Sequence, residues 1–231
     1  MQKIIIATSL LLLGSCRSNE IGNSKDVNPE AIYQEYSITA TEGEEYADLT
    51  AQFRFGGSNG TTLVLNDDSY ISLDGKKLDV DSSGFLGAFY KTRAKIPASP
   101  TDHEWAFADG KDKTYHNGFR LASFGLTNKF DKPLKPEDLE LNFTGFDEND
   151  SIHLNISDTS SLAAFRDIDT VLRITAGRAM VPGEQMKRLS TGPLTIQIVK
   201  YKNLSLAEAT KEGGAINYSF EFKTREAFLK K

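Results

Sequence analysis

The amino-acid sequence predicts an all-β protein made of two tandem β-sandwich domains. Two observations carry this prediction: segments in which apolar residues occupy every second position recur along the chain, and glycine-rich or Asp-Gly turns separate them. Helical periodicity is scarce, because only residues 182–189 and 204–211 offer short helical turns. Many short strands joined by tight turns are typical of sandwiches and barrels.

The clearest alternation lies at residues 47–55, where every odd-numbered residue is apolar, so that one face of a strand is suited to a core. We expect further strands at residues 62–65, 70–73, 105–107, 139–143, 152–156, 171–175, 194–201 and 216–222.

A stretch with two prolines, Pro133 and Pro136, interrupts this series of strands. We therefore expect a first sandwich over residues 37–127, a linker over 128–136 and a second sandwich over 137–231.

The N-terminus has the order of a signal peptide: Lys3, an apolar run over residues 4–13, and then small residues. The run is too short for a permanent anchor, because a membrane-spanning helix needs about 20 apolar residues. We expect residues 1–15 to be removed. Residues 16–36 are mostly polar and predict a flexible tether.

Leu13-Gly14-Ser15-Cys16 resembles the lipobox of bacterial lipoproteins, in which an aliphatic residue and two small residues precede the cysteine. The resemblance implies that lipid is attached to the Cys16 thiol and that the chain is cut just before it. Several acyl chains give stable anchoring to a membrane. Cys16 is the single cysteine of the chain, and lipidation accounts for its thiol. The alternative is an ordinary secreted protein with a chance cysteine.

The two predicted domains look like the tandem immunoglobulin-like domains of uncharacterised surface lipoproteins in Gram-negative bacteria. This resemblance is architectural, covers residues 37–231 and transfers no functional residues. It implies a protein of the cell envelope, held by lipid in the outer membrane.

The charge balance excludes one class of partner. Acidic side chains outnumber basic ones by 32 to 27, and the lysines and arginines are scattered among carboxylates. Nucleic acid is therefore not expected as a partner, because binding to its phosphates requires a clustered basic face.

Ser58 lies in Gly56-Gly57-Ser58-Asn59-Gly60, which matches the G-x-S-x-G pattern of hydrolase nucleophile elbows. That elbow requires a helix after the serine. Here β-branched and apolar residues follow and predict a second strand, so we interpret Ser58 as a turn residue.

A hairpin around Asp109-Gly110 brings two of the three histidines near each other. A two-residue loop would place His103 opposite His116, whereas a three-residue loop sets Trp105 against Tyr115 and separates the histidines. The second arrangement uses the aromatic face better, so we expect Trp105 in the core and no metal at the histidines.

Asp79, Asp81 and Ser83 place oxygen ligands at alternate positions before Gly84, as in the first half of a calcium loop. The glutamate expected at the twelfth position is replaced by Tyr90. These three residues are weak calcium candidates, and a solvated acidic turn is the alternative. No cofactor motif is present in the sequence.

None of the candidate nucleophiles or metal ligands lies in the sequence context that its chemistry requires, so the sequence predicts no catalytic residues. We expect a non-catalytic binding or accessory module of the cell envelope, whose partner is another envelope protein or a glycan. The alternative is a hydrolase that uses carboxylates to act on an envelope or extracellular polymer.

The lipobox makes a direct prediction about Cys16. Wild-type protein should incorporate labelled palmitate and fractionate with membranes, whereas Cys16→Ser should do neither, because attachment requires the thiol. Ser18→Ala, just beyond the lipobox, should behave as wild type. A wild-type protein that takes up no label and stays entirely soluble would refute the lipid anchor.

Overall fold

The computed structural model describes residues 20–66, 68–158 and 167–231, so the signal peptide and Cys16 lie outside the described residues. Strands make up 59% of the structure and helix 5%, which confirms the prediction of an all-β fold. Among the described residues, no helix has both the length and the apolar character needed to cross a membrane.

Eleven strands form one long sheet: β1 (Ile21–Asn23), β2 (Ile32–Thr41), β3 (Tyr46–Phe55), β4 (Thr61–Val64), β7 (Val80–Ser83), β8 (Gly87–Lys95), β13 (Ser151–Asp158), β14 (Asp167–Arg173), β16 (Gly192–Ser205), β17 (Gly214–Glu221) and β18 (Arg225–Leu229). A four-stranded sheet contains β5 (Ser69–Leu73), β6 (Lys76–Lys77), β9 (Thr101–Asp109) and β10 (Thr114–Leu121). A three-stranded sheet contains β11 (Gly125–Leu126), β12 (Leu139–Thr144) and β15 (Arg178–Val181). Within the described ranges, the helical turns are two 3-10 turns (Ser24–Asp26 and Pro29–Ala31) and α1 (Gly183–Met186).

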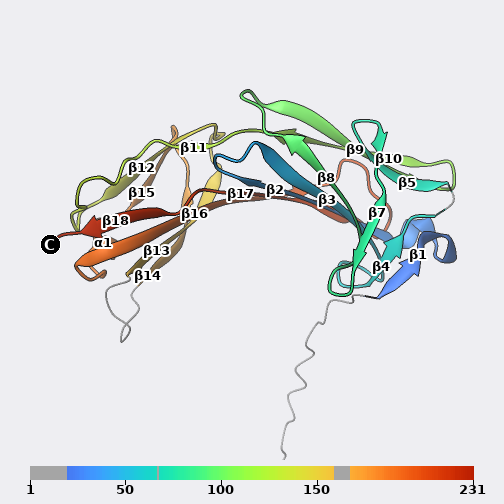
Figure 1. The fold of residues 1–231 in the computed structure, drawn as a ribbon, viewed down its shortest axis with the longest axis horizontal. Helices are drawn as coiled ribbons and strands as arrows, with labels where there is room; N and C mark the ends of the chain where they lie inside the picture. The colour runs from blue at the N-terminus through green and yellow to red at the C-terminus, as the bar shows by residue number, and fades with distance from the viewer. Residues whose placement is uncertain (1–19, 67, 159–166) are drawn as a thin grey trace, which may run out of the picture.

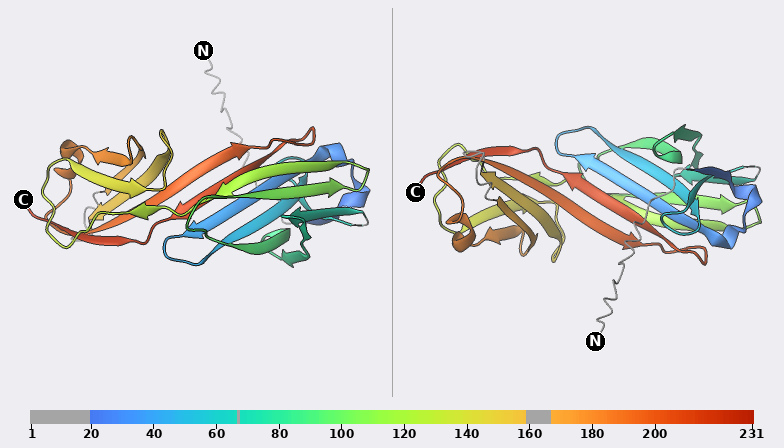
Figure 2. Two further views of the ribbon diagram at one scale, coloured as in Figure 1. Left: turned by 90° about the horizontal axis from the view of Figure 1, so that it is seen from above. Right: turned by 90° about the horizontal axis from the view of Figure 1, so that it is seen from below.

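The long sheet arches across the whole molecule, with strand order β1-β4-β3-β2-β17-β16-β13-β14, and both small sheets lie on the same side of it (Figure 1). Each small sheet covers one end of the long sheet, which gives two sandwich lobes (Figure 2, left). Buried apolar side chains of the three sheets form one hydrophobic cluster. The sandwich architecture with two lobes agrees with the sequence prediction.

The centre of the long sheet joins the two halves of the chain. Strand β17, near the C-terminus, pairs in parallel with β2, near the N-terminus, from Gly214 opposite Gln34 to Glu221 opposite Thr41. The chain passes from the four-stranded sheet to the three-stranded sheet between β10 and β11, and the predicted boundary at residues 128–136 lies just after that, between β11 and β12. The Asn128 side chain is anchored there, because its amide group bonds to the backbone of β12. The lobes therefore share a sheet as well as a connecting segment.

The expected tether over residues 16–36 is wrong from Glu20 onward. Strand β1 pairs with β4, and β2 begins at Ile32. Ile32, Gln34 and Tyr36 are all buried, and the Tyr36 hydroxyl donates to the Gln34 side chain at 3.0 Å. The polar Gln34 occupies an inward position and hides the alternation of this strand, which explains why the sequence reads as polar.

Aromatic side chains fill the core of the first lobe. Trp105 is fully buried and stacks on Tyr36 with 5.3 Å between ring centroids, while Phe53 and Phe107 lie 4.5 Å apart. Such ring pairs add to the stabilisation from apolar burial. The prediction that Trp105 belongs to the core is confirmed.

Where the lobes meet, the long sheet carries a buried lysine. The Lys200 ammonium lies over the rings of Phe124 and Phe146, at 4.7 and 4.6 Å from their centroids, and is hydrogen-bonded to Asp150. Burial lowers the pKa of Lys200, against the hydrogen bond and charge of Asp150. Burial also works to raise the pKa of Asp150, but hydrogen bonds and the two nearby lysine charges outweigh it and hold that pKa below its usual value.

We predict that Lys200→Ala lowers the free energy of unfolding by about 3 kcal/mol, because it leaves a buried carboxylate without its main partner. Lys202→Ala, which removes an exposed lysine 3.7 Å from Asp150, should cost less than about 1 kcal/mol. Urea denaturation measures both, and equal effects of the two changes would contradict this assignment.

The same pair predicts a pH dependence. The pKa of Asp150 is lower in the folded than in the unfolded chain, so the pair stabilises the fold above the unfolded carboxyl pKa of about 3.9. That contribution should disappear as the pH falls through the folded pKa, and wild type and Asp150→Asn should then approach each other in stability.

Candidate functional site

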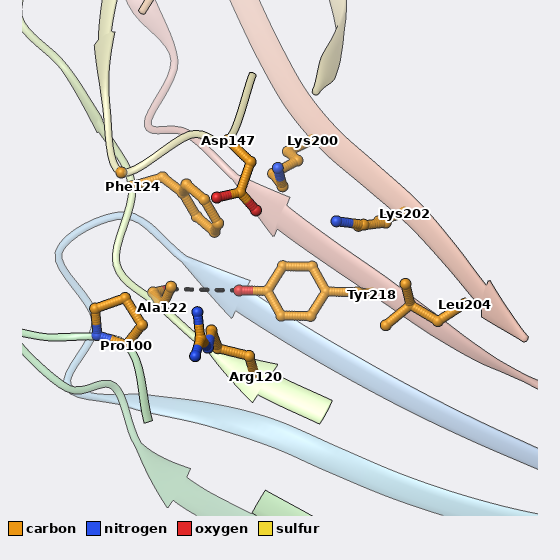
Figure 3. Close-up of a pocket in the computed structure, with 10 residues that line it drawn as sticks. Pro100, Arg120, Ala122, Phe124, Asp147, Lys200, Lys202, Leu204 and Tyr218 are labelled. Carbon is orange, nitrogen blue, oxygen red and sulfur yellow. Dashed lines mark hydrogen bonds between the residues drawn. The ribbon is translucent and has the colours of Figure 1, made fainter. Parts of the chain in front are cut away.

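A cavity of about 110 Å³ lies at the junction of the lobes, and its lining charges come from β10, β16 and the loop after β12 (Figure 3). Arg120, Lys200, Lys202 and Asp147 line it, together with Tyr218. Each of the three cations already has a carboxylate partner: Arg120 binds Asp102 at 3.0 Å, and both lysines bind Asp150. The charges are thus compensated within the protein.

Tyr218 also lines this cavity. Its hydroxyl donates to the carbonyl oxygen of Ala122 at 3.4 Å, and burial raises the pKa of the phenol to about 12. Phe124 and Leu204 supply apolar walls. A small cavity with satisfied charges and apolar walls fits a joint between the lobes better than a ligand site.

The outer face of the long sheet, opposite the small sheets, carries rows of short polar side chains. One row runs from Asn203 through Asn217, Ser37 and Thr50 to Lys91, since these residues are neighbours in the strand register. We call the outer surface of β16, β17, β2, β3 and β8 the polar face. These strands lie side by side in the view from below (Figure 2, right).

Two depressions on the polar face adjoin at Ser37. The first has a volume of about 220 Å³ and is lined by Ser37, Thr39, Tyr201, Lys202, Asn203, Asn217, Tyr218 and Ser219. The second has a volume of about 420 Å³ and is lined by Glu35, Ser37, Thr50, Gln52, Asp81, Leu86, Phe89 and Lys91. Because both contain Ser37, they form one groove across the five strands of the polar face. The volume of the larger depression is in the range of small-ligand sites.

The hairpin of β7 and β8 forms the wall of the larger depression, and side chains of the long sheet hold it in place by hydrogen bonds. The Gln52 side chain donates to the carbonyl oxygens of Leu86 at 2.7 Å and Ala88 at 2.9 Å. Arg54 in turn donates to Gln52 at 2.6 Å and lies 3.5 Å from Glu35. These side chains are on the outer face yet largely buried, so the wall has a rigid polar support.

Gly87 permits this close approach of the hairpin. Its φ of +74° lies in the left-handed region, and a Cβ atom there would stand 2.3 Å from the Thr62 hydroxyl oxygen. The hairpin can therefore fold over the sheet only with glycine at this position.

Charged side chains on the polar face neutralise one another. Asp48 lies 2.9 Å from Arg93 and 3.6 Å from Lys91. The hydrogen bond from Arg93 is the main cause that holds the pKa of Asp48 below its usual value. Glu35 is paired with Arg54. The groove therefore presents hydrogen-bonding groups with little net charge.

The calcium candidates lie on a strand and not on a turn as expected. Asp81 and Ser83 belong to β7, which pairs antiparallel with β8, and Asp79 immediately precedes it. Adjacent outward positions on an extended strand are too far apart to wrap around one ion. In the described ranges, no three His, Cys, Asp or Glu side chains gather in a way that suits a metal. Asp81 instead lines the groove.

Ser58 is exposed in the turn between β3 and β4. The residue that follows the motif starts a strand and not a helix, and Gly56 and Gly57 both have positive φ. The interpretation of Ser58 as a turn residue is confirmed.

The β9–β10 hairpin has the expected three-residue loop, but its register differs from the prediction. Thr114 lies opposite Ala108, so Tyr115 faces Phe107, and Trp105 faces Asn117. The Asp109 carboxylate sets this loop, because it accepts from the Lys111 amide at 2.7 Å.

The same register separates the two histidines. His103 lies opposite Phe119 and points toward the core, whereas His116 lies opposite Ala106 on the other face. Each histidine has its own carboxylate, Asp74 at 2.8 Å and Glu104 at 3.0 Å. The hydrogen bond between His116 and Glu104 raises the pKa of the His116 imidazole.

Comparisons with known proteins give only distant likenesses. No protein-family model and no curated protein matches the chain. A tetra-tandem repeat from the extending region of a large adhesion protein matches with a TM-score of 0.28 and 11% identity, over 84% of this chain and 49% of that one. Trypsin-activated alpha-2-macroglobulin from Escherichia coli matches with a TM-score of 0.24 and 11% identity, over 87% of this chain and 16% of that one. The chain thus spans half or less of either protein.

Proposed function

We propose that the protein is a non-catalytic, lipid-anchored module of the cell envelope that binds a neutral glycan through the polar face. The observation that carries the proposal is the groove that crosses the five strands of the polar face and is lined in large part by amide and hydroxyl side chains. The part of the proposal that places the protein in the outer membrane rests on the lipobox resemblance at Cys16.

The chemistry of the groove matches the surface of a saccharide. Sugars present hydroxyl groups that both donate and accept hydrogen bonds, and the side chains of Asn203, Asn217 and Ser37 do the same. Sugar rings also have apolar C–H faces that pack on aromatic rings. Tyr201 is 60% exposed at one end of the groove, and Phe89 lines the other.

A protein partner fits this surface less well. The cores of protein interfaces are apolar and rich in aromatic anchors, with few charged groups. In the groove, large apolar side chains occur only at the two ends, whereas the centre around Ser37 and Thr50 is lined by polar side chains. The paired charges likewise favour a neutral saccharide over a polyanion.

We predict that the soluble mature chain binds neutral oligosaccharides on a glycan array and in calorimetric titration. Tyr201→Ala and Asn217→Ala should each raise the dissociation constant about tenfold, which corresponds to about 1.4 kcal/mol. Met180→Ala is the control, because Met180 is 45% exposed on β15, away from the groove. Absence of any glycan binding, with a membrane protein captured through the same face, would contradict the proposal.

The hydrolase remains a second candidate because two carboxylates, Glu35 and Asp81, line the same depression. A pair of carboxyl groups flanking a sugar is the arrangement used in glycoside cleavage. The binding proposal expects no turnover of any glycan that the protein binds. Turnover that is lost in Glu35→Gln or Asp81→Asn, with an unchanged melting temperature, would establish the hydrolase instead.

A further inference from the structure

Strand β14 forms one end of the long sheet. It pairs with β13 along its whole length, from Asp167 opposite Ser157 to Arg173 opposite Ser151. No other strand among the described residues pairs with it, so its second edge presents backbone N–H and C=O groups over seven residues. Such an edge is a template for another strand.

The sequence of β14 lacks several of the usual protections against pairing. Edge strands are commonly guarded by charged side chains, especially lysine, by proline, by a bulge or by a very short length. The segment Asp167-Ile168-Asp169-Thr170-Val171-Leu172-Arg173 contains no lysine, proline or glycine. Its register with β13 is continuous, without a bulge.

The charges and apolar residues of β14 complement those of a second β14 in antiparallel orientation. With a twofold axis through Thr170, Asp167 of one copy faces Arg173 of the other, and Ile168 faces Leu172. At each end of the paired strands, the carboxylate of one copy then faces the guanidinium group of the other. Asp167 and Arg173 are exposed, and in the described part of the chain neither has an ion-pair partner.

This register also keeps the faces of the two sheets aligned. Paired positions differ by an even number of residues, so inward side chains meet inward ones and outward side chains meet outward ones. Asp169, which contacts His153 on the outer face, stands opposite Val171 of the other copy, and Val171 is 67% exposed. The pairing therefore covers the most exposed apolar residue of the strand.

We propose that a second copy of this chain pairs antiparallel along β14 and forms a symmetric dimer with one continuous sheet. Closed twofold pairing satisfies both edges at once and leaves no open β14 edge. The two polar faces then lie on the same side of the joined sheet. For a polymeric ligand, two grooves on one assembly raise the avidity without new contacts.

Sedimentation of the soluble mature chain tests this dimer. Wild type should show a concentration-dependent dimer. Arg173→Asp and Asp167→Arg should each weaken dimerisation by at least about tenfold, since both symmetry-related pairs change from attraction to repulsion. The double variant Asp167→Arg/Arg173→Asp restores opposite charges and should return to within about threefold of wild type.

Both side chains are exposed, so all four proteins should melt alike at a concentration too low for wild type to dimerise, and the melting temperature under those conditions serves as the control for folding. Gln197→Glu, an exposed charge change on β16, should leave the dimer intact. A monomeric wild type at every accessible concentration would overturn the proposal, and so would single variants that dimerise as well as wild type. Failure of the double variant to recover would overturn the pairing register.

Discussion

The structure depends on the parallel pairing of β2 with β17. Through it, a strand from the start of the chain and one from its end become neighbours at the centre of the long sheet. Parallel neighbours cannot be joined by a tight turn, and here most of the chain, from Thr41 to Gly214, lies between the two strands. Both lobes are built on the result, because β3 and β4 continue the long sheet from β2 on one side, while β16 and β13 continue it from β17 on the other.

The same pairing creates the binding surface that we propose. Asn217 and Ser37 are 180 residues apart in sequence but face each other in the register, and Ser37 is shared by both depressions. The small sheets cover only the inner side of the long sheet. Its outer side therefore alternates polar residues with the buried ones, as expected for a sheet with one solvated face. The buried support from Gln52 and Arg54 then shapes part of that flat face into a groove.

Local patterns in the sequence predicted much of the fold. Alternation located the strand around Phe53 and the core position of Trp105, and the residues after Ser58 identified a turn. Where a polar residue is buried, the same reasoning failed: Gln34 made β2 look like a tether. The hairpin register was missed because one side-chain carboxylate, that of Asp109, shifts it. The polar face was out of reach for a different reason, since its rows exist only after strands distant in sequence have paired. Short polar residues at the outward positions of β2 and β17 were the available signal.

Native-state hydrogen exchange measured by NMR tests the shared sheet most directly. If the pairing of β2 with β17 unites the lobes, the hydrogen-bonded amides of both strands should exchange only through global unfolding, with one common free energy and the same dependence on denaturant. The central strands of both lobes, β3 and β13, should show that value too. Exchange of β17 together with β13 at a clearly lower free energy, while β2 and β3 stay protected, would show two independent domains and contradict the account.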